Sequence, residues 1–251
     1  MTTRILSGLL FALTVPVCAL GPPSDIRNTV LADYKTHFRM PKFKSRREWE
    51  AHRIHLQRQI LAAAGLSPLP VKSPLHSQVL RTFDYVDYSV QVVLIETLPG
   101  YFLGGNLYLP VNRKSPAPAV LIPHGHWKQG RLEDQPSYSV PALGINLARQ
   151  GYIAFAYDMT GYNDTRQTPH SFGSPVHALW SFHPMGLQLW NSIRALDYVQ
   201  SLPGVDPNRL AITGASGGGS QTIFLAAVDD RIKVAAPVNM VSAHMQGGDP
   251  C

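Results

Sequence analysis

The most constraining feature of this 251-residue sequence is a glycine-rich turn between a short apolar strand and a helix, near the C-terminal end. Residues 210–213 form an apolar run that breaks at Gly214, and a helical pattern resumes over residues 221–228. Between them lies Gly-Ala-Ser-Gly-Gly, which places glycines two positions before and two after Ser216. A serine on so sharp a turn has strained backbone angles, and bulkier neighbours at those two positions would clash. The pattern therefore predicts a strand, a tight turn and a helix that together hold one serine in place.

Ser216 has the setting of a catalytic nucleophile, because the pattern GxSxG exposes the serine hydroxyl above a sheet. The first N–H groups of the following helix point at any oxyanion that forms beside that hydroxyl. We therefore expect Ser216 to attack a carbonyl carbon and the N–H of Gly217 to stabilise the resulting oxyanion. A glycine-rich turn without a catalytic serine is the alternative, because short motifs also match by chance.

The same residues also resemble the opening of a dinucleotide-binding fingerprint, TGxxxGxG, of the short-chain dehydrogenases. Ser220 stands where that pattern has its last glycine, and no tyrosine is followed four residues later by lysine. The motif also lies where no second half of a dinucleotide-binding fold could follow it. We therefore favour the hydrolytic interpretation and expect no cofactor.

A chain of this length is sufficient for one substantial core with an N-terminal extension. Its residues are 45% hydrophobic and 15% charged, which disfavours disorder. We divide it into a leader over residues 1–19, a helical extension and linker over residues 20–78, and an incomplete catalytic domain over residues 79–251.

The first nineteen residues have the layout of a secretory signal peptide. Arg4 precedes an apolar run over residues 5–17, and small residues end at Ala19. The run is too short for a membrane span and contains Pro16, so we expect cleavage after Ala19 and a secreted or periplasmic protein. The alternative is an apolar first helix of the mature fold. With Cys18 in the leader and one further cysteine, we expect no disulfide within the mature chain.

The net charge of +6 is concentrated between residues 35 and 58. Such a run could bind nucleic acid or an acidic polysaccharide. The sequence favours a solvated helix face instead, because Ser45 and Glu48 form a capping box and Gly65 ends the helix. Trp49, Leu56 and Ile60 would share one side of it. We therefore expect no nucleic-acid partner.

The remaining segments alternate between strand and helix patterns, which predicts a mostly parallel sheet with helices on both faces. Residues 89–98 and 101–109 read as an antiparallel hairpin. The later elements are strands over residues 117–123, 152–157 and 234–238, a helix over residues 140–150 and a helix that begins at Pro184.

The loop at residues 123–127 leaves the strand two before the one that carries Ser216, which is where the second half of an oxyanion hole is built. Gly125 lets the backbone approach a substrate carbonyl, and the N–H of His126 or Gly125 would pair with that of Gly217. His124 and His126 could alternatively ligate zinc, but no third ligand is evident nearby, so we expect no metal.

These residues carry a resemblance to the α/β-hydrolase superfamily, within the acetyl xylan esterase and dienelactone hydrolase-like group of secreted bacterial esterases. It covers roughly residues 80–251 and rests on residues 124–126, 158–162, 184–197 and 213–219. The resemblance implies that Ser216 is the nucleophile and that Gly217 and His126 donate oxyanion N–H groups. A serine, where dienelactone hydrolases use cysteine, implies ordinary ester cleavage.

The sequence departs from this superfamily after the nucleophile, where an acid and a histidine should follow on later strands. Only 35 residues follow Ser216. Asp229 and Asp230 lie too close to the turn, and His244 and Asp249 fall in a segment that reads as loop. We therefore expect the last strands, the acid and the base to be absent.

The expected function is that of a serine carboxylic-ester hydrolase that acts through an acyl-enzyme on a small-molecule or carbohydrate ester. Acetyl groups on plant polysaccharide are the expected substrate, and Tyr162 and Trp127 could stack on sugar. The alternatives are a non-catalytic relative that binds a ligand or partner, and a prolyl oligopeptidase-type peptidase. The oligomeric state is left open.

Overall fold

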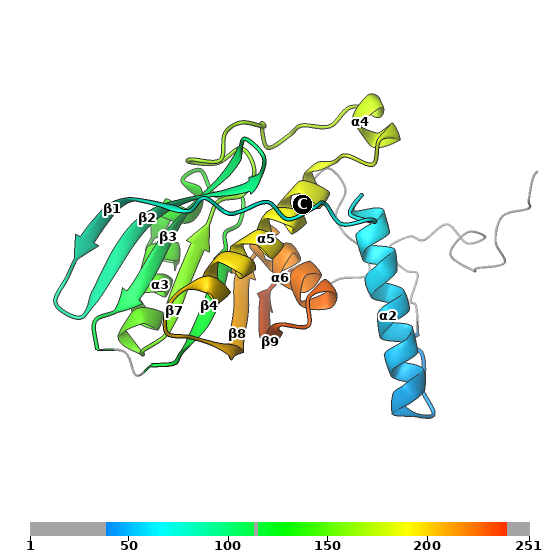
Figure 1. Cartoon of the computed structure of the whole chain (residues 1–251), viewed down its shortest axis with the longest axis horizontal. Helices are drawn as coiled ribbons and strands as arrows, with labels where there is room; N and C mark the ends of the chain where they lie inside the picture. The colour runs from blue at the N-terminus through cyan, green and yellow to red at the C-terminus, as the bar shows by residue number, and fades with distance from the viewer. Residues whose placement is uncertain (1–38, 113–114, 240–251) are drawn as a thin grey trace, which may run out of the picture. The chain divides into compact units, whose positions relative to one another are not determined.

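A computed structural model of the chain describes residues 39–112 and 115–239 (Figure 1). The predicted signal peptide, His244 and Asp249 lie outside these residues. The chain divides into one unit over residues 1–40 and a second over residues 41–251, and the description below concerns the second.

The described part of the second unit is built around a seven-stranded mixed sheet (Figure 1). Its order is β1-β2-β3-β7-β4-β8-β9; the pairs from β1 to β7 are antiparallel, and β7, β4, β8 and β9 run parallel. The strands are β1 (Gln78–Asp84), β2 (Tyr88–Leu98), β3 (Tyr101–Pro110), β4 (Ala117–Pro123), β7 (Ile153–Tyr157), β8 (Val205–Ala215) and β9 (Ile232–Val238). A separate pair consists of β5 (Asp134–Gln135) and β6 (Tyr138–Ser139). The predicted hairpin and parallel strands are confirmed, and the hairpin makes the sheet mixed because it joins antiparallel to β7.

Helices cover both faces of this sheet, as the sequence predicts. They are α2 (Arg46–Ala63), α3 (Val140–Arg149), α4 (Pro175–Leu179), α5 (Pro184–Ser201) and α6 (Gly217–Val228), with a 3₁₀ helix, η1 (Gly130–Leu132). In Figure 1, α5 and α6 lie on the near face of the sheet and α3 lies behind it. No helix in the described ranges is long and apolar enough to cross a membrane.

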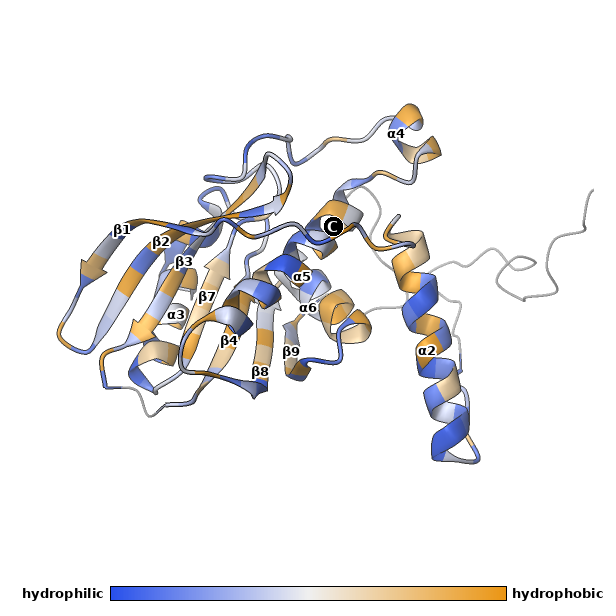
Figure 2. Cartoon of the chain, in the orientation of Figure 1, coloured by the Kyte–Doolittle hydropathy of each residue, from blue (hydrophilic) through white to orange (hydrophobic). Residues whose placement is uncertain are grey.

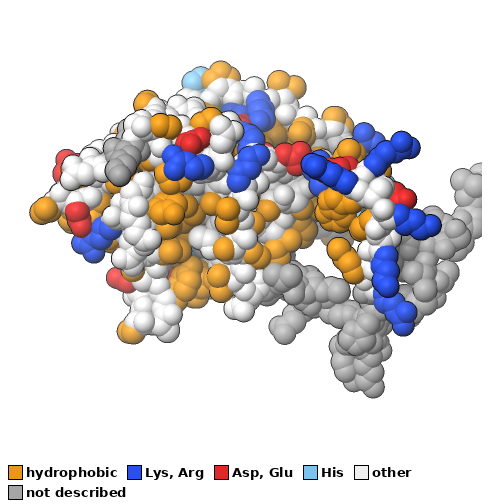
Figure 3. All heavy atoms as spheres, turned by 90° about the horizontal axis from the view of Figure 1, so that it is seen from below, with side chains coloured by type: hydrophobic (Ala, Val, Ile, Leu, Met, Phe, Trp, Pro, Cys, Tyr) orange, Lys and Arg blue, Asp and Glu red, His pale blue; other side chains and the backbone are white. Residues whose placement is uncertain are grey.

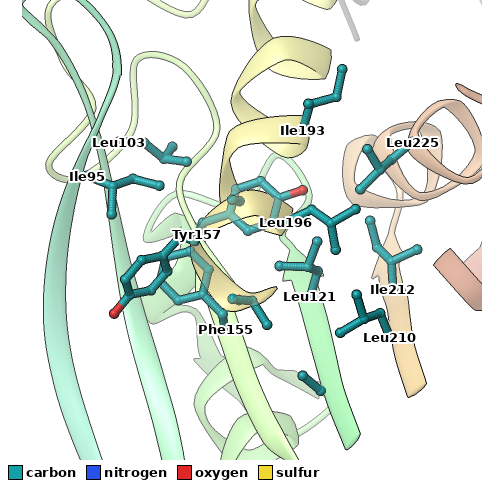
Figure 4. Packing of buried hydrophobic residues seen from close by; sticks show 14 of the residues in the cluster. Ile95, Leu103, Leu121, Phe155, Tyr157, Ile193, Leu196, Leu210, Ile212 and Leu225 are labelled. Carbon is teal, nitrogen blue, oxygen red and sulfur yellow. The ribbon is translucent and has the colours of Figure 1, made fainter. Parts of the chain in front are cut away.

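Successive side chains along the central strands point to opposite faces of the sheet, and this divides the core into two unequal layers. In β7, Phe155 and Tyr157 belong to the larger cluster beneath α5 and α6, while Ala154 and Ala156 belong to the smaller cluster against α3. Large residues thus fill the α5 and α6 side, and alanines allow α3 to lie close to the opposite face. Figure 4 shows Phe155 in one layer with side chains from β4, α5 and β8, including Leu121, Leu196 and Ile212.

The basic helix α2 differs in detail from its sequence pattern. Ser45 Oγ accepts from the N–H of Glu48 at 3.2 Å, but the Glu48 carboxylate accepts from the N–H of Lys44 at 2.7 Å, so the capping box is not closed on Ser45. Gly65 follows the helix with φ +68°, as expected of a terminating glycine.

The predicted apolar side of α2 is only partly buried. Ile60 packs against the core, but Trp49 and Leu56 are more than one third exposed. The helix itself forms as predicted, so these three residues recur at helical spacing, and polar and apolar residues intermingle along it (Figure 2). Gln57 nevertheless donates to the Val228 carbonyl at the end of α6, at 2.6 Å. Lys and Arg side chains gather toward the side of the molecule where α2 lies (Figure 3).

Candidate active site

The predicted turn is present between β8, which ends at Ala215, and α6, which begins at Gly217. Ser216 stands between them with φ +56° and ψ −122°, a backbone conformation that non-glycine residues rarely adopt. Its N–H donates to the Val238 carbonyl at 3.0 Å, and its carbonyl accepts the N–H of Ser220 at 3.1 Å. The serine backbone is therefore fixed by β9 on one side and by the first turn of α6 on the other, while the residue itself is only half-buried.

A close approach of two backbones explains the glycine at position 218. A Cβ atom there would lie 2.1 Å from the carbonyl oxygen of Pro123, the last residue of β4. Gly214 faces the same oxygen, and a Cβ added at position 214 would lie 2.4 Å from it. The turn that carries Ser216 thus packs directly on the end of β4, and the loop after β4 begins beside it.

His124 is the first residue of that loop and is fully buried. Its Nδ1 lies 2.7 Å from the Gly125 carbonyl, which can only accept, so Nδ1 carries the proton. Its Nε2 accepts the N–H of Met159 at 3.0 Å. Burial lowers the pKa of His124 to about 3, so the ring is neutral. Both ring nitrogens are engaged within the protein, which leaves neither for the alternative role as a zinc ligand.

Gly125 and His126 continue the loop across the turn. A Cβ on Gly125 would lie 2.8 Å from the carbonyl oxygen of Ala215, so this glycine allows contact with the end of β8. The His126 ring lies beside Gly217, where a Cβ would be 2.8 Å from its Cε1 and 3.1 Å from its Nδ1. The structure therefore brings together the four residues that the sequence singled out, Ser216, Gly217, Gly125 and His126.

A second loop, after β7, reaches the same place and carries a histidine that sequence reasoning missed. His170 Nε2 lies 2.7 Å from His126 Nε2, and His170 Nδ1 lies 2.9 Å from the carbonyl oxygen of Thr160. Tyr162 contacts the rings of both His124 and His170 edge to face, with centroids 5.0 and 5.2 Å away. Nothing in the sequence marks His170, because it lies in an irregular loop far along the chain from His126.

This second loop is anchored by a buried ion pair between Arg131 and Asp158, which the sequence also did not reveal. Arg131 bonds to the carboxylates of Asp158 and Asp164, and its Nε donates to Asn106 at 3.2 Å. Burial alone would lower the pKa of Arg131, but the two carboxylates outweigh burial and raise it. Asn163 and the N–H of Asp164 donate to Asp158 at 2.9 and 3.0 Å. The loop therefore leaves β7 in a fixed direction.

The two aromatic residues considered for sugar stacking are engaged inside the protein. Trp127 stacks on Tyr138 with ring centroids 3.9 Å apart, and Tyr162 lies between two histidine rings. Within the described ranges, no group of three or more His, Cys, Asp and Glu residues could hold a metal ion.

Comparisons with known proteins agree with this architecture. The family model described as Acetyl xylan esterase (AXE1) matches residues 83–244. The YtaP protein of Bacillus subtilis (strain 168), a hydrolase by name, is 31% identical over 180 residues, which are 67% of this chain and 58% of YtaP.

Solved structures extend the comparison to the fold. Methylesterase BT1017 has a TM-score of 0.68 and 28% identity, over 83% of this chain and 45% of that one. The acetyl xylan esterase from Paenibacillus sp. R4 has a TM-score of 0.53 and 24% identity, over 78% of this chain and 60% of that one. The expected α/β-hydrolase fold is confirmed. The chain spans about half the length of the proteins it matches.

Proposed function

Because this chain belongs to the acetyl xylan esterase (AXE1) family, we propose that it is a serine carboxylic-ester hydrolase with Ser216 as its nucleophile. The observation that carries the proposal is the strained backbone of Ser216 at the junction of β8 and α6, with the β4 loop packed against it. Strain of this kind persists only where the surrounding structure enforces it, and it concentrates at functional sites.

In the proposed reaction, Ser216 Oγ attacks the ester carbonyl carbon, and the carbonyl oxygen becomes an oxyanion. The N–H groups of Gly217 and His126 stabilise that oxyanion, and Gly125 allows the loop to come close. The tetrahedral intermediate expels the alcohol and leaves an acyl-enzyme. Water then attacks the acyl carbon, and the carboxylic acid product and free serine are released. Each oxyanion donor of this kind contributes on the order of 3 kcal/mol to transition-state stabilisation.

The proton of Ser216 needs a general base, and we place neither the base nor its carboxylate partner among the described residues. His124 uses both nitrogens within the core, and His170 is engaged with Thr160 and His126. The superfamily places its acid and histidine after the nucleophile in the chain. A form of the enzyme that lacked them would retain only the residual catalysis of an oxyanion hole and substrate binding.

For the substrate, we propose an ester carried by a small molecule or carbohydrate, with acetyl groups on plant polysaccharide as the first candidate. The support is the family, together with the names of similar structures, an acetyl xylan esterase and a methylesterase. Export through the leader at residues 1–19 would bring the enzyme to such a polymer, and we retain secretion or a periplasmic location as part of the proposal.

The test is covalent labelling of the full chain with a fluorophosphonate, followed by mass spectrometry to locate the adduct. We expect an adduct on Ser216, its loss in Ser216→Ala, and its retention in Ser220→Ala, a matched serine four positions further along. An absence of labelling at Ser216 would favour a non-catalytic relative that binds a ligand. Rates on acetyl, methyl and peptide substrates then separate an esterase from a prolyl oligopeptidase-type peptidase.

A further inference from the structure

Two histidine rings connect the loops after β4 and β7, next to the elbow, which is the turn at residues 214–218 that carries Ser216. Their geometry specifies where each proton lies. His126 comes from the loop after β4 and His170 from the loop after β7. Their Nε2 atoms are 2.7 Å apart, and the rings meet edge to face with centroids separated by 4.7 Å. A contact this short between two nitrogens requires that one donate a proton and the other accept it.

The Thr160 carbonyl determines which nitrogen donates. A carbonyl oxygen only accepts, so His170 Nδ1, at 2.9 Å, must carry a proton. When both rings are neutral, His170 has a lone pair on Nε2, and this lone pair accepts the Nε2 proton of His126. Neutral His126 is thereby left with its lone pair on Nδ1. One backbone carbonyl thus sets the tautomers of both rings in sequence.

The position of the His126 ring links this arrangement to the elbow. Its Cε1 and Nδ1 edge fills the space in which a side chain at position 217 would lie, and Met159 Cε lies 2.9 Å from the same point. The ring is therefore one wall of the space beside the Gly217 backbone. Any movement of the ring would move the His126 backbone or open that wall, and either change would affect the proposed oxyanion hole.

We propose that His170 is a positioning residue, which holds the His126 ring in the Nε2-protonated tautomer against Gly217 and so fixes the loop that supplies the second oxyanion N–H. The structural part of this proposal stands on the described contacts alone, and its consequence for reaction rate rests on the proposed function. His170 contacts the His126 ring, and the Cε1 and Nδ1 edge of that ring lies beside Gly217. It acts through His126.

The wild-type tautomers are the first test and need no variant. Long-range nitrogen spectra of the full chain labelled with ¹⁵N-histidine distinguish a protonated ring nitrogen from one with a lone pair. We expect His126 protonated at Nε2 and His170 protonated at Nδ1. A His126 ring protonated at Nδ1 with a lone pair on Nε2 would overturn the proposal, whether or not the protein hydrolyses esters.

Two substitutions at position 170 then separate hydrogen bonding from packing. His170→Gln keeps one acceptor and one donor, so we expect the His126 spectrum and the labelling rate of Ser216 to stay close to wild type. His170→Phe keeps an aromatic ring beside Tyr162 but removes both hydrogen bonds, so we expect the His126 tautomers to mix. His177→Phe, an exposed histidine on α4, is the matched control and should change neither readout.

The kinetic expectation for His170→Phe is a fall of roughly 10²-fold in the maximal rate of fluorophosphonate labelling, because small misplacements of a catalytic group have effects of that size. The inhibitor concentration that gives half-maximal rate should change little, because binding contacts remain. Unchanged His126 signals in His170→Phe, or equal rates for the Phe and Gln variants, would refute the positioning role. A wild-type chain that is never labelled would refute the proposed function instead, and the spectra would still decide the role of His170.

Discussion

Two adjacent glycines at the start of α6 provide a paired test of how the elbow is packed. Replacing either Gly217 or Gly218 with alanine gives the same gain in helix propensity, about 0.5–1 kcal/mol. The two methyl groups would meet different neighbours. At position 218, the new Cβ would lie 2.1 Å from the Pro123 carbonyl oxygen, whereas ordinary contact begins near 3.4 Å. At position 217, it would meet His126 Cε1 at 2.8 Å and Met159 Cε at 2.9 Å.

The expected stabilities of the two variants differ because backbone cannot move aside as a side chain can. A Gly218→Ala protein has to separate α6 from β4 by more than 1 Å. Overpacking of this severity costs about 3 kcal/mol, or about 2 kcal/mol net of the helix gain. For a unit of this size, that loss lowers Tm by roughly 4–8 °C. In Gly217→Ala, the Met159 side chain can rotate away and the His126 ring can shift, so we expect stability within about 1 kcal/mol of wild type.

Thermal and urea unfolding of the two purified variants measure this difference, with Gly100→Ala as a control. Position 100 has open space around it and φ +73°, so its cost is backbone strain alone. The rate at which a fluorophosphonate labels Ser216 should fall more in Gly217→Ala than in Gly218→Ala, which is the reverse of the order expected for stability. The reason is that Gly217→Ala displaces the His126 ring beside the oxyanion donors while leaving the fold intact. Equal unfolding midpoints for Gly217→Ala and Gly218→Ala would show that β4 and α6 are not in the close contact described.

Three further predictions concern single groups near the elbow. Ser216→Gly should raise the free energy of unfolding by about 1 kcal/mol in urea titrations, because glycine relieves the positive φ, while fluorophosphonate labelling disappears. Asp158→Asn should destabilise the protein by about 3 kcal/mol, because it leaves buried Arg131 with one charged partner; Asp206→Asn, at an exposed pair, is the control and should change unfolding little. The pKa of His124 is about 3 when folded and 6.5 when unfolded, so the unfolded chain binds the proton more tightly and stability falls as pH decreases from 6.5 towards 3. This group alone should lower the free energy of unfolding by about 2 kcal/mol at pH 5, and a His124→Gln variant should lack that pH-dependent component in urea titrations at pH 7 and pH 5.

The elbow and the central strands could be predicted from sequence because their signals are local. Glycines at positions 214 and 218 are required by a turn of a few residues, and the apolar runs of β4 and β7 are short and bounded by polar segments. The order of strands, loops and helices along the chain then predicted that the β4 loop lies beside Ser216, although the sequence contains no measured distance between them. Parallel strands deliver their carboxyl ends to one edge of a sheet, so the prediction followed from connectivity.

The contacts that fix the loops could not be predicted, because they join residues far apart in the sequence. Arg131 pairs with Asp158 through a buried geometry that no spacing rule describes. His170 lies 44 residues from His126, in a segment without helix or strand periodicity. The extent to which α2 is covered could not be predicted for a related reason, since a helical pattern shows which residues share a side but not whether another element covers it.

The placement of β4 between β7 and β8 explains why the long-range contacts gather where they do. Because β4 is central, its following loop lies between the loops of both neighbours and must make room for each. It meets the elbow after β8 through glycines, which permit backbone contact, and the loop after β7 through histidines, which permit hydrogen bonds. On the β8 side, a substitution that presses on the β4 backbone, as in Gly218→Ala, should therefore act mainly on stability. Substitutions that displace the His126 ring, as in Gly217→Ala or, on the β7 side, His170→Phe, should act mainly on the geometry of the loop between them. If both kinds of substitution changed stability and labelling in the same proportion, the loop would be responding as one rigid body, and this division between its two sides would be wrong.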